Sequence, residues 1–206
     1  MAVLTNPIGI LYAEIDSADS LKLTGDRVLY GAKKSSLAQT EWLTRQKVAR
    51  CRESIARIVH SHGGIVCAIA GDQVFCNLPN PDATLQAACE IQQGQGRNAS
   101  TETHDVSDIV TTPLGIRVAT HYAPLVVNSG RIQGPAREAA HSILKRAETD
   151  QIVASQALVD ALAPQARGRI RELGIWSLGG DDGDIQVYDV DWSEADERDA
   201  VPTPSV

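Results

Sequence analysis

Apolar and polar residues recur with two different periods along the chain, and these periods predict where strands and helices alternate. The mostly apolar segment Ile8–Ile15 predicts a first strand. From about Ser35 to His62, apolar side chains recur mostly every third or fourth residue and Arg and Lys residues lie on the other face, which predicts an amphipathic helix. The pair Gly63-Gly64 then ends that helix.

The segment between His62 and Pro79 predicts a β-hairpin. Two runs of β-forming residues, Ile65–Ala70 and Gln73–Leu78, flank the dipeptide Gly71-Asp72, which is typical of a tight turn. Such a turn displays the carboxylate of Asp72 at its tip, where it contributes little to a core. Asp72 is therefore a candidate for contact with a metal or a ligand, and a plain turn is the simpler alternative.

The rest of the pattern predicts further helices and strands around a polar segment. We expect a helix from Asn80 to about Gln93, an exposed loop over Gly94–Thr112, strands at Leu114–His121 and Ala123–Val127, a helix near Ala136–Glu148, a strand at Gln151–Ala154, a short helix at Gln156–Leu162, and closing strands near Ile170–Leu178 and Ile185–Val190. The order βαββαβ with extra strands predicts an α+β fold, with a central, mostly antiparallel sheet and helices on one sheet face.

Length and charge narrow the class of protein. With 206 residues, the chain can form one domain with a substantial core, which we place at residues 1–192, followed by an acidic, Pro-rich tail or linker at residues 193–206. A net charge of −7 argues against binding to a nucleic-acid backbone. No apolar run approaches the roughly 18 residues of a membrane helix, and the N-terminus lacks the features of a signal peptide. We therefore expect a cytoplasmic protein without a membrane partner.

The four cysteines show no spacing typical of a metal site. A two-residue turn at Gly71-Asp72 would place Cys67 opposite Cys76 across the hairpin. Small buried thiols in a reducing compartment are the ordinary interpretation of such residues, and a redox pair is the alternative.

Several motifs occur in the order and spacing of one known family. The hairpin is similar to the phrase GG-x-x-x-K-x-x-GD-x-x-x-x-x-F, and Ile10–Ile15 is similar to a first strand ending in F-A-D-I. Further similar segments are Gly115–Val127 (V-x-I-G-I-H-x-G-P-V), Gly134 with Ala147–Ser155 (G-x-x-V-N-x-A-A-R followed by A-x-x-G-Q-I-x-x-S), Leu178-Gly-Gly180 (L-K-G) and Val187–Val190 (V-Y-x-V). On these motifs, the chain resembles the class III nucleotidyl (adenylate/guanylate) cyclase homology domain from roughly Pro7 to Asp191.

The resemblance implies a chemistry and a set of partners. In such domains, the 3′-hydroxyl of a nucleoside triphosphate attacks its own α-phosphate, and two metal ions, Mg²⁺ or Mn²⁺, are held by two carboxylates. Two sites form at the interface of a head-to-tail dimer. One subunit supplies the metal carboxylates, and the other supplies a Lys and an Asp or Thr for the base, an Asn and an Arg for the transition state, and a Lys for the phosphates.

The resemblance places the metal ligands at Glu14 and Asp72. Asp72 matches the hairpin acid of the family, whereas Glu14 replaces an Asp and carries one more methylene. Asp16 lies two residues further along and shares the strand face of Glu14, so the three acids are candidates for one cluster. The alternative is that Glu14 and Asp16 are solvated acids at a strand end.

The positions that one subunit lends to its partner all depart from the family pattern. Ala68 stands at the position of the base-reading Lys, Arg131 at that of the Asp or Thr, Glu138 at that of the Asn, Ser142 at that of the Arg, and Gly179 at that of the phosphate-binding Lys. Loss of one preorganised donor typically lowers a rate by about 10²–10³. Arg137, Lys145 and Arg146 are candidate replacements for the missing Arg, against the alternative of a solvated helix face, and His141 is expected to pack at the dimer interface.

Three hypotheses follow. The first is a degenerate cyclase-homology domain that dimerises and acts as a regulatory module in signal transduction. The second is the metal-donating half of a heterodimer with another cyclase-like chain, because both metal positions remain acidic. The third is an active cyclase that forms a 3′,5′-cyclic nucleotide from a different nucleoside triphosphate, with Arg131 selecting a pyrimidine base.

Overall fold

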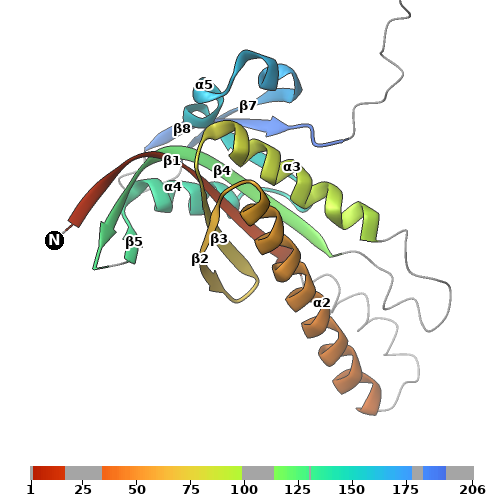
Figure 1. Cartoon of the computed structure of the whole chain (residues 1–206). Coiled ribbons are helices and arrows are strands. Elements are labelled where there is room, and N and C mark those ends of the chain that lie inside the picture. The colour runs from red at the N-terminus through yellow and green to blue at the C-terminus, as the bar shows by residue number, and fades with distance from the viewer. Residues whose placement is uncertain (1, 17–33, 99–113, 130, 178–182, 194–206) are drawn as a thin grey trace, which may run out of the picture.

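One sheet organises the part of the chain that the computed structural model describes, which comprises residues 2–16, 34–98, 114–129, 131–177 and 183–193 (Figure 1). The elements are β1 (Ala2–Asp16), α2 (Lys34–Ser61), β2 (Ile65–Ala70), β3 (Gln73–Leu78), α3 (Pro81–Asn98), β4 (Gly115–Asn128), β5 (Arg131–Gln133), α4 (Pro135–Leu144), β6 (Ile152–Ser155), α5 (Gln156–Ala161), the 3₁₀ helix η1 (Pro164–Arg169), β7 (Ile170–Ser177) and β8 (Asp184–Val190).

Seven of the strands follow the order β2-β3-β1-β4-β6-β8-β7, and β5 pairs with β4 beside this path. Among the described pairings only β4–β6 is parallel. The predicted α+β class with a mostly antiparallel central sheet is confirmed. None of the described helices combines the length and the apolar character needed to cross a membrane.

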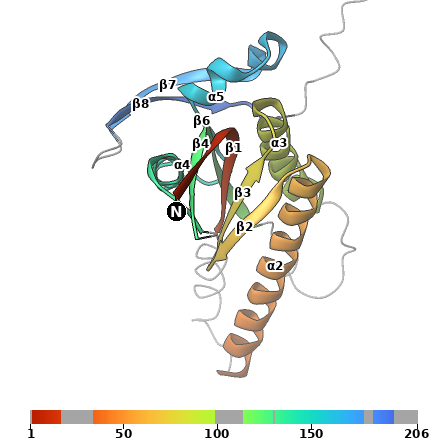
Figure 2. The ribbon, with the colours of Figure 1, turned by 60° about the vertical axis from the view of Figure 1, so that its left-hand side comes forward.

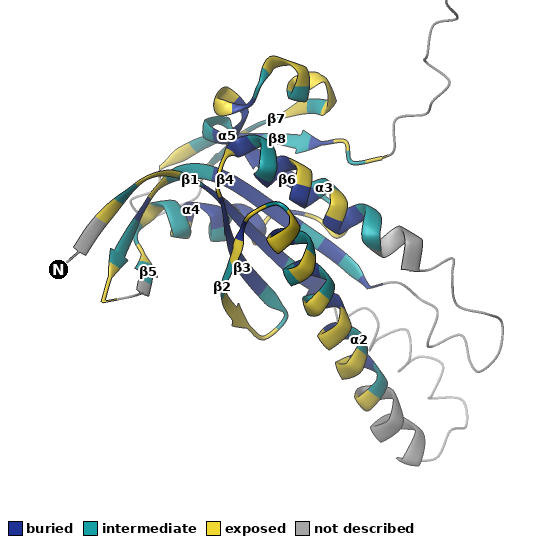
Figure 3. Cartoon of the chain, viewed as in Figure 1, coloured by how far each residue is buried: buried dark blue, intermediate teal, exposed yellow. Residues whose placement is uncertain are grey.

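Helices cover both faces of the sheet, so the expectation that they lie on one face is wrong (Figure 2). Leu11, Ala13 and Ile15 of β1 belong to a cluster with buried residues of α2, α3 and α5. Ile10 and Tyr12 belong to a second cluster on the opposite face, with buried residues of α4. Alternate residues of a strand point to opposite faces, so the part of β1 over Ile10–Ala13 is buried on both sides at the centre of the molecule (Figure 3).

The hairpin β2–β3 has the predicted bounds, and Gly71 adopts a φ of 57° in its turn. A bulge changes the register further from the turn, because Ala68 pairs with Phe75 whereas Val66 pairs with Cys76. Cys67 is therefore the extra residue of the bulge and does not face Cys76 as predicted. All four cysteines are free thiols, and burial raises the pKa of Cys51 and of Cys76 to about 12.

Several element bounds differ from the predicted ones. β1 begins at Ala2, α3 continues to Asn98, and β4 is one strand where two were expected. The helix α4 ends at Leu144 rather than near Glu148, although Ala147 is still buried, and this burial produced the helical pattern beyond the true end. The short elements β5 and η1 were not predicted. Residues 99–112 of the expected loop, Gly179 and the tail beyond residue 193 lie outside the described residues.

Candidate functional site

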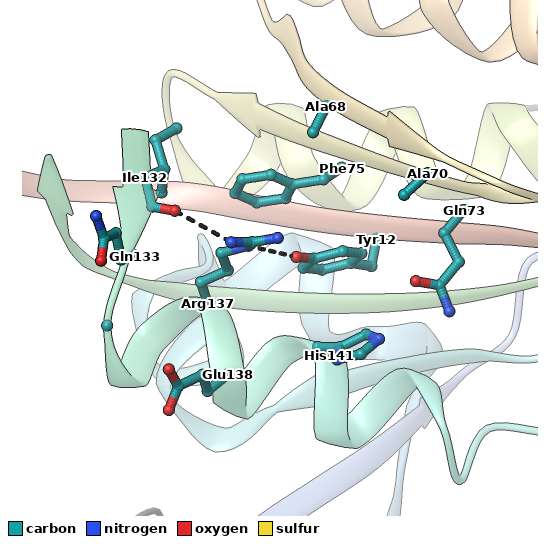
Figure 4. A pocket seen from close by; sticks show the side chains of 11 residues that line it. Tyr12, Ala68, Ala70, Gln73, Phe75, Ile132, Gln133, Arg137, Glu138 and His141 are labelled. Atoms are coloured by element: carbon teal, nitrogen blue, oxygen red, sulfur yellow. Dashed lines mark hydrogen bonds between the residues drawn. The ribbon is translucent and has the colours of Figure 1, made fainter. Parts of the chain in front are cut away.

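A pocket of about 540 Å³ opens on the α4 face of the sheet, between β1, the hairpin β2–β3, β5 and α4 (Figure 4). Its lining comprises Tyr12, Ala68, Ala70, Gln73, Phe75, Ile132, Gln133, Gly134, Arg137, Glu138 and His141. The pocket therefore brings together residues from five elements that are far apart in the sequence.

Two stacked aromatic rings and one arginine form the inner part of this pocket. The rings of Tyr12 and Phe75 lie 4.7 Å apart between centroids at an interplanar angle of 18°. Arg137 reaches from α4 over the Phe75 ring, 5.4 Å from its centroid, donates from Nε to the Tyr12 hydroxyl at 2.9 Å, and donates from Nη1 to the Ile132 carbonyl at 3.2 Å (Figure 4). Burial raises the pKa of Tyr12, so its hydroxyl stays protonated at neutral pH. The guanidinium of Arg137 is thus held by neutral partners.

His141 and Glu138 complete the α4 side of the pocket. The His141 ring lies 5.5 Å from the Tyr12 ring, and burial, with Lys145 and Arg137 nearby, lowers the pKa of His141. The imidazole is therefore neutral at pH 7. Glu138 is exposed, and its carboxylate points away from the aromatic stack (Figure 4). It leaves a negative charge at the mouth of the pocket.

Only some of the five positions that one subunit is expected to lend to its partner lie in this pocket. Ala68 and Glu138 line the pocket, whereas Ser142 is half-buried on α4 and is not among the lining residues. The backbone of Arg131 pairs with that of Asn128 in the β4–β5 ladder. Gly179 lies outside the described residues. The roles assigned to these positions stay predictions.

The sequence did not identify two α4 residues, Arg137 and His141, as lining residues of a pocket. Arg137 was only one of several candidate replacements, and His141 was expected simply to pack at an interface. Both follow Gly134 at the helical spacing of three and then four residues that directs side chains to one face.

Glu14, the predicted metal ligand at the end of β1, is held between two neighbouring strands. Gln73 of β3 and Arg117 of β4 are its direct cross-strand partners. Arg117 donates from Nη2 to Oε1 of Glu14 at 2.9 Å, and Gln73 donates from Nε2 to Oε2 at 2.9 Å. Both carboxylate oxygens therefore accept hydrogen bonds from the protein itself, and neither Gln73 nor Arg117 was singled out from the sequence.

The other two candidate acids also have protein partners. Oδ1 of Asp72 lies 3.3 Å from Nη2 of Arg52, which also donates to the Gly71 carbonyl. Thr149 donates from Oγ1 to Oδ2 of Asp16 at 2.9 Å. Within the described ranges, no group of three or more His, Cys, Asp or Glu side chains is placed to hold a metal ion. The assignment of Glu14, Asp72 and Asp16 as metal ligands stays a prediction, and these contacts do not fit it.

Solved structures of cyclase domains resemble this chain over most of its length. An adenylate/guanylate cyclase/hydrolase from Silicibacter pomeroyi matches with a TM-score of 0.68 and 22% identity, covering 92% of this chain and 98% of that one. A non-canonical dimeric guanylyl cyclase domain of the RhoGC fusion protein from Blastocladiella emersonii matches with a TM-score of 0.63 and 12% identity over 91% and 97% of the two chains. The guanylate cyclase domain of RhGC from Catenaria anguillulae, solved with GTP, matches with a TM-score of 0.63 and 13% identity over 92% and 98%. No protein-family model and no curated protein matches the sequence.

Proposed function

We propose that this chain, whose fold is that of class III nucleotidyl cyclase domains, is a catalytically degenerate member that dimerises and serves as a signalling or regulatory module. The observation that carries the proposal is the chemistry of the α4-face pocket. Its lining combines one arginine held by neutral partners, a neutral histidine, a carboxylate and an alanine at the position of the expected lysine.

Such a lining gives little stabilisation to a cyclising nucleotide. Negative charge on the phosphoryl oxygens must be met by preorganised donors, and each lost donor typically costs about 10²–10³ in rate. Among the described pocket residues, Arg137 is the only one with a permanent positive charge, and its Nε and Nη1 already donate to Tyr12 and Ile132. Glu138 adds an opposing charge one residue away. We infer that the pocket neither selects a purine through Ala68 nor steadies a polyphosphate.

Dimerisation does not require the family's catalytic and base-reading residues that this chain lacks, so we propose that it is retained. The guanylyl cyclase domain from Blastocladiella emersonii, which has a similar fold, forms a non-canonical dimer. A second copy of this chain, or another cyclase-like chain, would cover the open α4 face. In this proposal, the dimer transmits a signal through its association rather than through a product.

The test is an end-point assay of the purified chain with ATP, GTP, CTP and UTP, each with Mn²⁺ and with Mg²⁺. We expect no cyclic nucleotide above the level made by the matched variant Asp72→Ala. A 3′,5′-cyclic product that disappears in Asp72→Ala would overturn the proposal, and a product from CTP or UTP alone would identify an active cyclase with pyrimidine specificity. A product that arises only after mixing with a second cyclase-like chain would favour the heterodimer hypothesis.

A further inference from the structure

We propose that the guanidinium of Arg117 takes the place of a divalent cation beside Glu14 and closes this position to metal ions. The inference concerns metal binding and does not depend on the proposed function. It rests on the row of side chains that runs across three strands at the edge of the pocket.

The pairing of the strands fixes this row. Gln73, Glu14 and Arg117 are direct partners in the β3–β1 and β1–β4 ladders. Directly opposite residues in antiparallel strands have Cβ atoms about 4.5–5.5 Å apart on one face of the sheet. The side chains of Gln73 and Arg117 therefore reach the carboxylate of Glu14 from its two sides, and each of the carboxylate oxygens accepts one hydrogen bond of 2.9 Å.

The surroundings hold Arg117 in this position. Its side chain is 28% exposed and that of Glu14 is 21% exposed, so water screens their attraction less than on an open surface. A second contact anchors the guanidinium, because Nη1 lies 3.4 Å from the Ala147 carbonyl beyond the end of α4. Rotation of Arg117 away from the row would leave the half-buried carboxylate of Glu14 with the neutral amide of Gln73 as its hydrogen-bond donor among the described residues.

The second acid shows the same arrangement with a different arginine. Arg52 of α2 lies 3.3 Å from Asp72 and also donates to the Gly71 carbonyl, so it is fixed at the hairpin turn. Each of the two acids that the sequence suggested as metal ligands therefore has its own guanidinium partner. The negative charge of both carboxylates is therefore compensated within the protein.

A divalent ion does not fit beside these partners. Mg²⁺ requires oxygen ligands at about 2.0–2.1 Å in a nearly ideal octahedron. The Nη2 atom of Arg117 occupies the approach to Oε1 at 2.9 Å and carries part of a unit positive charge, which repels a cation. Oε2 accepts a hydrogen bond from Gln73, so a metal ion at either oxygen of Glu14 would compete with a donor of the protein.

The experiment is a titration with Mn²⁺ alone, in which electron paramagnetic resonance measures the free ion. We expect no binding at Glu14 in the unmodified chain. In Arg117→Met, which keeps an unbranched stem and removes the charge, we expect Mn²⁺ affinity to rise about tenfold or more, because a unit positive charge beside the carboxylate is gone. Adding Glu14→Gln to Arg117→Met should abolish the gain.

Arg171 offers a matched control. It is the direct cross-strand partner of Asp189 in the β7–β8 ladder and donates from Nη2 to Oδ2 of that acid at 3.0 Å, away from Glu14. Arg171→Met should bind no more Mn²⁺ than the unmodified chain. An equal gain in Arg171→Met would overturn the proposal, since any unpaired strand carboxylate would then account for the effect.

Two further outcomes would also overturn it. One is binding of Mn²⁺ by the unmodified chain that is lost in Glu14→Gln, a result that is independent of how the Arg117 variants fold. The other is a folded Arg117→Met, or a folded Arg117→Gln where the first variant does not fold, that binds no more Mn²⁺ than the unmodified chain. Cyclic nucleotide formation without Mn²⁺ at Glu14 would contradict only the proposed function, so the two proposals fail separately.

Discussion

At the scale of single residues, His121 connects the sheet to the start of a helix. It is buried in β4, and its Nδ1 lies 2.7 Å from Oγ of Ser155, the N-cap of α5. That hydroxyl also accepts a hydrogen bond from the backbone N–H of Leu158 at 3.3 Å. A neutral imidazole can accept the single hydroxyl proton, and burial lowers the pKa of His121 to about 4. The histidine matches a family motif position, and its role here is structural.

This burial predicts a loss of stability in acid. As the pH falls below 6.5, the ordinary pKa of histidine, the unfolded chain gains a proton at His121, whereas the folded chain does so only near pH 4. The free energy of unfolding should therefore fall between about pH 6.5 and pH 4, by about 3 kcal/mol over the full range. Urea unfolding at several pH values measures it, and His121→Gln should show a smaller fall.

His62 provides the control for this experiment. Its side chain is half-buried, and Nε2 lies 2.8 Å from the carboxylate of Glu90. His62→Gln should keep the steep acid loss of the unmodified chain, because His121 is intact. A fall that is the same in His121→Gln as in the unmodified chain would contradict the assignment.

The residues of the candidate site were predictable to different degrees. Glu14, Asp72, Ala68 and Glu138 could be located because each lies at a fixed offset from a local motif. The partners of Glu14 could not be found in this way. Gln73 and Arg117 are 59 and 103 residues away along the chain, and only the register of three strands brings them together. Local motifs can locate a candidate site residue, whereas its contacts depend on the pairing of strands that are distant in the sequence.

At the scale of elements, the best predictions are those that depend on local turn chemistry. The hairpin has its predicted bounds because Gly71 supplies the positive φ that its turn requires. The helix α2 ends at Ser61 because Gly63, with a φ of 73°, closes its last turn. The bulge at Cys67 has no comparable local signature, since it depends on how β2 lies against β3.

The junction between α2 and β3 gives a prediction at this scale. A Cβ atom on Gly64 would lie 2.7 Å from the backbone carbonyl of Asn77 and 2.9 Å from Cγ1 of Val59. Because a backbone atom cannot rotate away, Gly64→Ala must separate the end of the helix from the strand. We expect the free energy of unfolding to fall by about 1–3 kcal/mol, as measured by urea denaturation.

Gly168 is the matched control for this substitution. It lies in η1, and a Cβ atom there would meet no heavy atom within 4 Å. Gly168→Ala should change the free energy of unfolding by no more than about 0.5 kcal/mol. If Gly64→Ala and Gly168→Ala have equal effects, the close approach of α2 to β3 does not limit stability.

At the scale of the whole molecule, the two faces of the sheet are covered unequally. Buried residues of α2, α3 and α5 pack on one face, whereas the described helix on the other face is α4, with ten residues. The apolar run over Ile10–Ala13 indicates burial on both faces, because a half-exposed strand alternates with polar residues. The prediction that helices lie on one face of the sheet was based on the order of elements and did not take this apolar run into account. The hairpin side of the α4 face remains open around the pocket.

This open region leads to the last prediction, which concerns association. Ile65 of β2 pairs with Asn77, two residues beyond Phe75 on the same face, so its side chain lies on the α4 face and is 58% exposed. If a second copy covers this face, Ile65→Asp places an unpaired charge in the interface and should weaken the dimer about tenfold or more. Ile175→Asp changes a 68% exposed residue on the far edge strand β7 and should leave the dimer intact. Sedimentation equilibrium measures both variants, and a dimer that Ile65→Asp leaves unchanged while Ile175→Asp dissociates it would place the interface at β7 instead.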